Sequence, residues 1–149
     1  MQRIHITLFI TILTILISTL LGACSGAGSM QAAEPFPMAS TDQMPEEVRS
    51  APATVLQAYQ FAAANPDVLK RIPCYCGCGS VGHASNYACY VADVEADGKV
   101  TYDAHALGCS ICVDITQDTM RLLREGQGTA EIKAYIDQTY SQYGPSNIP

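Results

Sequence analysis

Most of the cysteines of this chain are crowded into two short patches, and this crowding strongly limits how the chain can fold. The first patch is PCYCGCG at residues 73–79, in which cysteines alternate with tyrosine and glycine. The second patch is the pair Cys109-x-x-Cys112. A fold that contains both patches must bring many sulfur atoms together. The predicted metal ligands are Cys74, Cys76, Cys78, Cys89, Cys109, Cys112, His83 and His105.

The alternating cysteines of the first patch are poor disulfide partners for one another. Extended residues advance about 3.3 Å each, which places the Cα atoms of Cys74 and Cys76 about 6.6 Å apart. That separation is at the upper limit of what a disulfide spans. Thiolates this close repel one another, and a soft cation between them removes the repulsion. Gly77 and Gly79 allow the backbone to curl so that the sulfurs converge.

The second patch is predicted to lie at the start of a helix. There Cys109 and Cys112 share one face of the first turn, and the positive end of the helix dipole stabilises a thiolate. A cysteine cluster on a loop combined with a pair at a helix start is typical of zinc sites. The six thiols exceed the four ligands of one Zn(II), which indicates a bridged multinuclear site, a site for Cu(I), or one site with the two remaining cysteines as disulfide partners. His83 and His105 are candidate ligands or hydrogen-bond donors to the ligands.

Two other functions remain open for these cysteines. Outside the cytoplasm an even number of cysteines is ordinarily oxidised, so three disulfides would make a stapled interaction module without metal. The Cys109-x-x-Cys112 pair at a helix start also suits a thiol-disulfide exchange protein, although no strand-helix-strand pattern surrounds it. We rank metal binding first, since it explains the clustering most directly.

The N-terminal residues 1–23 predict a lipoprotein signal peptide. Arg3 precedes the apolar run LFITILTILISTLL, which ends in Leu21-Gly22-Ala23-Cys24, the pattern of a lipobox. The thiol of Cys24 is then expected to carry the lipid, with palmitate-type acyl chains that anchor the protein in the bilayer. An uncleaved membrane anchor is the alternative. Either arrangement places the rest of the chain on the extracytoplasmic side of the cell membrane.

The charge balance and the motifs exclude several other functions. A formal net charge of −6 argues against nucleic acid as a partner. The chain has no His-Glu-x-x-His sequence, no serine in a nucleophile turn and no glycine-rich phosphate loop. We therefore expect a non-enzymatic protein, with thiol redox chemistry as the only plausible catalytic role. The sequence identifies no protein partner.

The mature chain divides into a flexible linker, residues 24–50, and a folded domain, residues 51–149. Apolar periodicity predicts helices over residues 51–64 and 109–124 and a last helix that runs to residue 143, with Ser50 and Thr129 as caps of the first and the last. The sequence Asn65-Pro66-Asp67 predicts a further short helix over residues 66–70. Two β-rich runs around Asp97-Gly98 predict a hairpin. The expected fold class is α+β: a small, mostly helical domain with one β-hairpin between the two cysteine-rich patches. Its core has no Trp, so disulfide or metal staples would stabilise it.

The hexapeptide PCYCGC at residues 73–78 and the segment GCSICVDI at residues 108–115 together resemble the PCYCGC-motif family of bacterial lipoproteins. The resemblance extends over most of the mature chain. It implies a lipid-anchored protein in which Cys74, Cys76 and Cys78 carry the function. It does not identify a metal.

Overall fold

The structure is a computed structural model, and it describes residues 35–148. The predicted signal peptide and the predicted lipidation site Cys24 lie outside the described residues. Within the described part of the chain, no helix is both long enough and apolar enough to cross a membrane.

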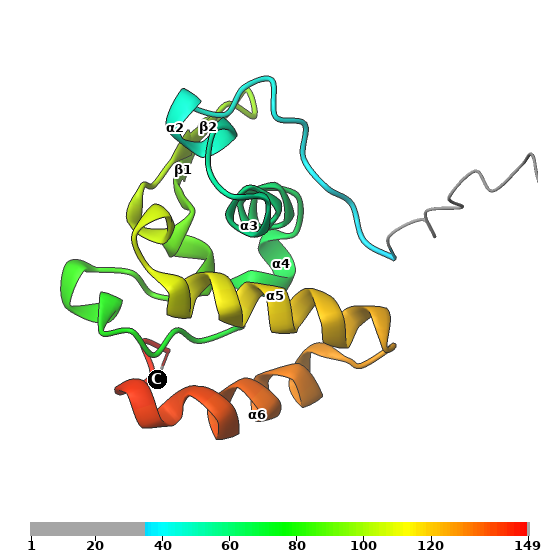
Figure 1. Ribbon diagram of the computed structural model, residues 1–149, viewed down its shortest axis with the longest axis vertical. Coiled ribbons are helices and arrows are strands. Elements are labelled where there is room, and N and C mark those ends of the chain that lie inside the picture. Colours follow the sequence, from blue (N-terminus) through cyan, green and yellow to red (C-terminus); the bar gives the residue numbers. More distant parts are fainter. Residues whose placement is uncertain (1–34, 149) are drawn as a thin grey trace, which may run out of the picture. The chain divides into compact units, whose positions relative to one another are not determined.

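Three longer helices form the framework of the domain. They are α3 (Ala53–Ala64), α5 (Ser110–Arg124) and α6 (Thr129–Tyr140). Figure 1 shows α5 between the other two, with α3 crossing it on one side and α6 running back along it on the other. Gly126, with φ of 81°, permits the tight reversal between α5 and α6.

Short elements connect these helices. The hairpin pairs β1 (Val91–Val94) with β2 (Val100–Tyr102) in antiparallel register, and an irregularity between Val91 and Asp93 bends β1. The remaining helices of the described residues are α2 (Glu46–Arg49), α4 (Pro66–Leu69) and the 3₁₀ helices η1 (Cys78–Val81), η2 (Asn86–Cys89), η3 (His105–Leu107) and η4 (Ser141–Tyr143). The predicted α+β class, mostly helical with one hairpin between the cysteine patches, is confirmed.

The core consists of apolar side chains from these helices and from the segments that join them. Leu, Ile and Phe side chains contribute about 1.5–3 kcal/mol each when they are fully buried. Those that are completely shielded from solvent are Phe61, Leu69, Ile72, Ile115, Ile132 and Ile136. Four of the six cysteines of the described residues, Cys74, Cys78, Cys89 and Cys112, are buried in the same core. The cysteine cluster is therefore continuous with the apolar interior.

The folded part begins earlier than the expected domain boundary at residue 51. Residues 46–49 form α2, and Met44 and Val48 are buried. Before them, the Phe36 ring packs edge-on against Phe61 at 4.9 Å between centroids. The expected linker is thus wrong for residues 36–50. Its apolar side chains are isolated in the sequence, like Phe36 against Phe61 of α3, and such contacts leave no period in the sequence.

Two predicted helix starts also differ in detail. The helix expected from residue 51 begins at Ala53, with Pro52 at its N-cap, and the Ser50 hydroxyl instead donates to Glu46 O at 2.8 Å at the end of α2. Thr129, which we expected to cap the last helix, is its first residue. Both differences lie outside the cysteine cluster.

Candidate metal centre

Three segments that are distant in sequence bring the cysteines together. The PCYCGCG loop leads into η1, the helix η2 supplies Cys89, and the start of α5 supplies Cys109 and Cys112. Gly77 has a φ of 84°, a conformation that favours glycine, so the loop turns back at this point as predicted. Gly79, the other glycine expected to allow the curl, has no positive φ.

The sulfur atoms lie at the spacing of metal ligands. A disulfide bond is about 2.05 Å long, whereas a tetrahedral zinc ion with bonds of about 2.3 Å holds its sulfurs about 3.8 Å apart. All six cysteines of the described chain are free. The Sγ–Sγ distances are 3.3 Å for Cys109–Cys112, 3.4 Å for Cys74–Cys76 and Cys74–Cys112, 3.5 Å for Cys76–Cys112 and 3.7 Å for Cys78–Cys89.

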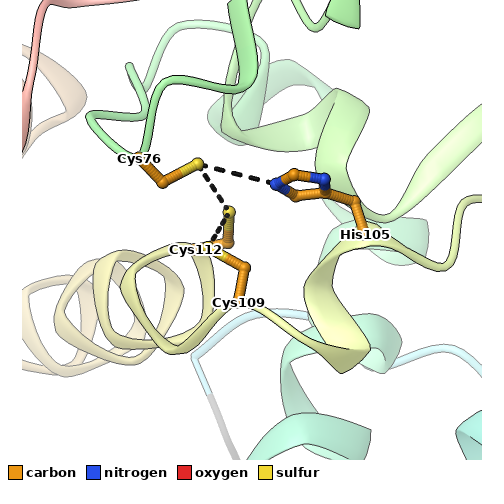
Figure 2. Close-up of side chains that lie close together, drawn as sticks. All are labelled: Cys76, His105, Cys109 and Cys112. Atoms are coloured by element: carbon orange, nitrogen blue, oxygen red, sulfur yellow. Dashed lines mark hydrogen bonds between the residues drawn. The ribbon is translucent and has the colours of Figure 1, made fainter.

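One group of ligand atoms lies at the start of α5. Its four ligand atoms, all within 4.8 Å of one another, come from Cys76, His105, Cys109 and Cys112. Figure 2 shows the three sulfurs and the imidazole converging from the loop, from η3 and from α5. The His105 Nε2 atom lies 3.6 Å from the Cys76 sulfur. Three sulfurs and one nitrogen form a Cys₃His set, which is one of the sets found in structural zinc sites.

A second group lies deeper in the domain and contains Cys78, His83, Cys89 and, again, His105. Cys74 lies between the two groups, since its sulfur is within 4.8 Å of those of Cys78 and Cys89 as well as those of Cys76 and Cys112. All eight residues that the sequence singled out therefore meet in one cluster.

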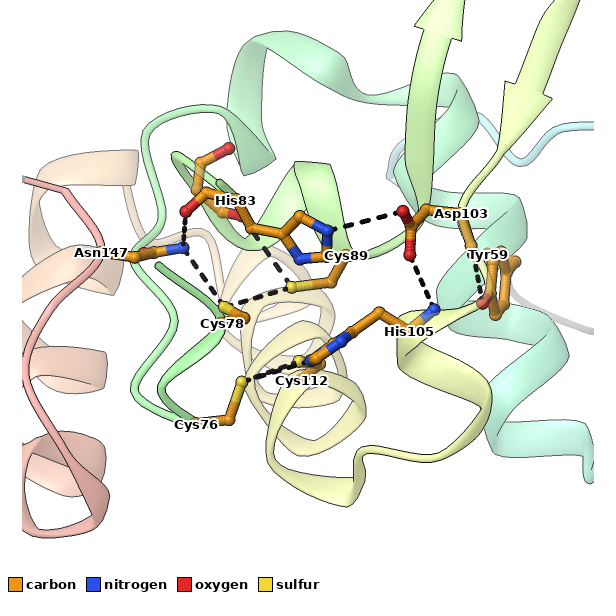
Figure 3. Close-up of polar contacts among 10 residues, drawn as sticks. Tyr59, Cys76, Cys78, His83, Cys89, Asp103, His105, Cys112 and Asn147 are labelled. Atoms are coloured by element: carbon orange, nitrogen blue, oxygen red, sulfur yellow. Dashed lines mark hydrogen bonds and ion pairs between the residues drawn. The ribbon is translucent and has the colours of Figure 1, made fainter. Parts of the chain in front are cut away.

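The His83 ring is oriented for ligation. Its Nε2 atom lies 3.5 Å from Oδ2 of Asp103, while its Nδ1 atom is buried and has no hydrogen-bond partner in the described part of the chain. Figure 3 shows the ring between Asp103 and the sulfurs. A ligating histidine usually donates its other N–H to a carboxylate, which leaves a lone pair for the metal. A buried nitrogen without a partner is costly, and a metal ion would satisfy it.

The comparison with protein families gives one match. A family model described as a protein of unknown function with PCYCGC motif matches residues 13–149. The chain belongs to this PCYCGC family. The matched range contains both cysteine patches and the C-terminal helices. The comparison with curated proteins gave no match, and neither did the comparison with solved structures.

Asp103 supports both histidines of the PCYCGC cluster. Its Oδ1 accepts a hydrogen bond from the backbone N–H of His105 at 2.7 Å, in addition to the contact of Oδ2 with His83. Its backbone oxygen accepts a 2.7 Å hydrogen bond from the hydroxyl of Tyr59, which ties the site to α3. An acidic residue and a histidine two positions apart after a hairpin are ordinarily an exposed polar pair. Asp103 and His105 are instead half-buried, and their contacts hold the ligands in place.

A buried polar network fixes the start of α5. The Tyr90 hydroxyl and the Asn86 amide both donate to the backbone oxygen of Cys112, at 2.8 and 3.2 Å. Thr116 joins them, with its hydroxyl 2.7 Å from Asn86 Oδ1. Asn86, Tyr90 and Thr116 are fully buried. Sequence reasoning missed this network, although a run such as NYACY, with polar side chains around a cysteine, is a usable signal.

Sequence reasoning also missed Asn147, near the C-terminus. Its Oδ1 accepts from the backbone N–H of Cys74 at 2.7 Å, and its Nδ2 donates to His83 O at 3.0 Å and lies 3.5 Å from the Cys78 sulfur. Gly144 allows the tail to reach this place, since a Cβ there would lie 2.7 Å from Tyr75 O. A residue after the last helix offers no local sign that it closes a site formed earlier in the chain.

The thiols of the cluster have unequal acidities. Hydrogen bonds from Cys112 and Cys89 lower the pKa of Cys74 to about 2. Burial raises the pKa of Cys76 and of Cys78 above the usual range, and the hydrogen bond with Cys74 raises the pKa of Cys112. Without a cation the cluster therefore favours an ionised Cys74 beside protonated thiols of Cys76, Cys78 and Cys112. Binding of a metal ion would supply the positive charge that allows the others to ionise, with release of protons.

Proposed function

We propose that this member of the PCYCGC family is a membrane-anchored, extracytoplasmic lipoprotein that binds a soft metal ion, Cu(I) or Zn(II), through its clustered cysteines. The observation that carries the proposal is the convergence of six free thiols and two imidazoles from separate segments at ligand spacing. Thiolates are preferred by both ions, and the mixed sulfur and nitrogen sets also suit Zn(II).

The structure favours this proposal over a disulfide-stapled module. The shortest sulfur–sulfur distance, 3.3 Å, is well beyond bonding distance. Three disulfides would also leave the Nδ1 atom of His83 buried without a partner. A metal ion accounts for both the sulfurs and this nitrogen, whereas covalent pairing accounts for neither.

The role of the bound ion is proposed to be buffering, delivery or structural support rather than catalysis. The lipobox at residues 21–24 supports attachment of the domain to the outer face of the cell membrane through the acylated Cys24. An anchored domain with a surplus of negative charge would retain metal ions close to the membrane.

The test is intact mass spectrometry combined with elemental analysis of the protein purified from its own membrane. We expect copper or zinc together with six thiols that react with a thiol reagent only after the ion is removed. A mass lower by two hydrogens for each of three bridges, without metal, would overturn the proposal in favour of the stapled module. A partial loss that mild reductant reverses would support thiol-disulfide exchange instead. A Cys24→Ser variant should lose the lipid and leave the membrane fraction, with its metal content unchanged.

A further inference from the structure

The ligand atoms of the cluster can be divided into two sets of four. Zn(II) takes four ligands in structural sites, and eight candidate ligands are present. The two groups that each contain His105 compete for it, and its Nε2 atom lies 3.6 Å from Cys76, which assigns it to the group at the start of α5. The Cys74 sulfur lies 3.4 Å from those of Cys76 and Cys112 and within 4.8 Å of those of Cys78 and Cys89, so it borders both groups. Because the outer group already has four ligands, Cys74 supplies the fourth ligand of the deeper group.

The two sets differ in their exposure to solvent. In the inner set, Cys74, Cys78 and Cys89 are at most 2% exposed, and the His83 side chain is 12% exposed. In the outer set, Cys76, Cys109 and His105 are half-buried, and only Cys112 is buried. Figure 2 shows the outer ligands around the start of α5. An incoming ligand can therefore approach the outer set more easily than the inner set.

A surface hollow lies next to the outer set. Its volume is about 340 Å³, and its wall includes Cys109, Leu107, Thr54 and Asp114. A hollow of this size can admit a small chelator or the side chain of another protein. Exchange of a metal ion requires such an approach, because an incoming ligand must bind before the last protein ligand leaves.

Both sets are held at the backbone, since Cys74, His105 and Cys112 each have a backbone hydrogen bond to a side chain outside the cluster. The ligand atoms themselves differ in their support. In the inner set Asp103 contacts the His83 ring, and Asn147 contacts the Cys78 sulfur. The sulfurs of Cys76 and Cys109 make polar contacts only with other members of the cluster, as far as residues 35–148 are concerned. Ligands that are held from behind change position less readily.

We infer that the cluster binds two ions of unequal lability. An inner ion held by Cys74, Cys78, Cys89 and His83 is retained, and an outer ion held by Cys76, Cys109, Cys112 and His105 exchanges with ligands that enter through the hollow. This inference rests on the proposed metal binding. It adds a separate role for each ion: the inner ion stabilises the fold, and the outer ion is the one that the protein delivers.

The experiment uses the full chain in detergent, loaded with Zn(II) alone. Elemental analysis should give two ions per chain. Transfer of zinc to a colorimetric chelator should show two kinetic phases of equal amplitude. The rate of the fast phase should exceed that of the slow phase about ten- to hundredfold, which is the range by which supporting groups change metal affinity. Cadmium NMR of the protein loaded with Cd(II) should show two resonances.

Variants assign the phases. Cys109→Ser should remove the fast phase and one cadmium resonance and leave the slow phase unchanged, while the exposed neighbour Ser110→Ala should leave both. Circular dichroism checks that Cys109→Ser still folds, and His105→Gln provides a second outer variant. A single ion, a single release phase, or equal loss of both ions in Cys109→Ser overturns the inference and leaves metal binding intact. A chain that binds no zinc or cadmium overturns the proposed function itself.

Discussion

The two ends of α5 are held in place by different forces. At the C-terminal end Met120 and Leu122 are buried beside α6, whose Ile132 and Ile136 are also buried. At the N-terminal end Cys112 lies within 3.5 Å of three other sulfurs, and its carbonyl accepts two hydrogen bonds from the buried network. One helix thus joins an apolar core to a sulfur cluster (Figure 1).

This difference shows how the small domain divides its sources of stability. Apolar burial stabilises the C-terminal end of α5 in any solution that supports folding. The N-terminal end buries thiols that become strong ligands only when ionised, and buried charge is costly until a cation compensates it. We therefore expect the metal to stabilise one end of α5 much more than the other.

The largest expected effect comes from removal of the metal. Metal binding adds its free energy to the stability of the segments that form the site. A chelator should therefore lower the Tm and speed amide hydrogen exchange in η1, η2 and the first turn of α5, while α6 keeps most of its protection. Hydrogen exchange with mass spectrometry measures both ends at once. Equal loss of protection in α6 and in the cluster would remove the distinction between the two ends.

The next effect tests the apolar end. Ile136→Ala should destabilise the domain by about 2–5 kcal/mol, because Ile136 is completely buried and its removal leaves a cavity. The metal content should not change, since no ligand is in α6. Chemical denaturation and elemental analysis of the same sample measure the two quantities, and Ile136→Val, expected to cost about 0.5–1.5 kcal/mol, is the matched control. Loss of metal in Ile136→Ala would contradict the independence of the two ends.

A smaller effect is expected from the support behind the histidines. Asp103→Asn should lower the metal affinity about 10–100-fold, because a neutral amide is a weaker acceptor for the His83 N–H. The backbone hydrogen bond from His105 can persist, so the fold should remain. Competition with a chelator measures the affinity. Asp93→Asn, an exposed position in the same hairpin, is the control and should bind metal like the unchanged protein.

The last expected effect is gradual, because it is the change in metal affinity with pH. Burial raises the pKa of Cys76 and of Cys78, so these thiols are protonated at neutral pH and a proton must leave each when the metal binds. The apparent affinity should fall as the pH falls, by about tenfold per pH unit for each displaced proton. Because the pKa values are raised, the rise in affinity should continue above pH 9. Chelator competition across a pH series tests this, and a plateau below about pH 8.5, the ordinary thiol pKa, would contradict it.

Much of this protein was determined by its sequence alone. The helices α3, α5 and α6 and the hairpin follow from local periodicity and from turn chemistry such as Asp97-Gly98, which depend on neighbouring residues. The candidate ligands could also be named from the sequence, because closely spaced cysteines are poor disulfide partners for one another and their thiolates repel without a cation. Membership of the PCYCGC family was recognisable from the hexapeptide itself.

Only the tertiary structure decided how these parts are used. The packing of residues 36–49 on α3, the role of Asp103 behind both histidines and the return of Asn147 to Cys74 all join residues that are distant in sequence. The division of the ligands into an inner and an outer set depends on burial, which is a property of the whole fold. Side-chain chemistry is encoded residue by residue, whereas distance and solvent exposure arise only when separate segments pack together.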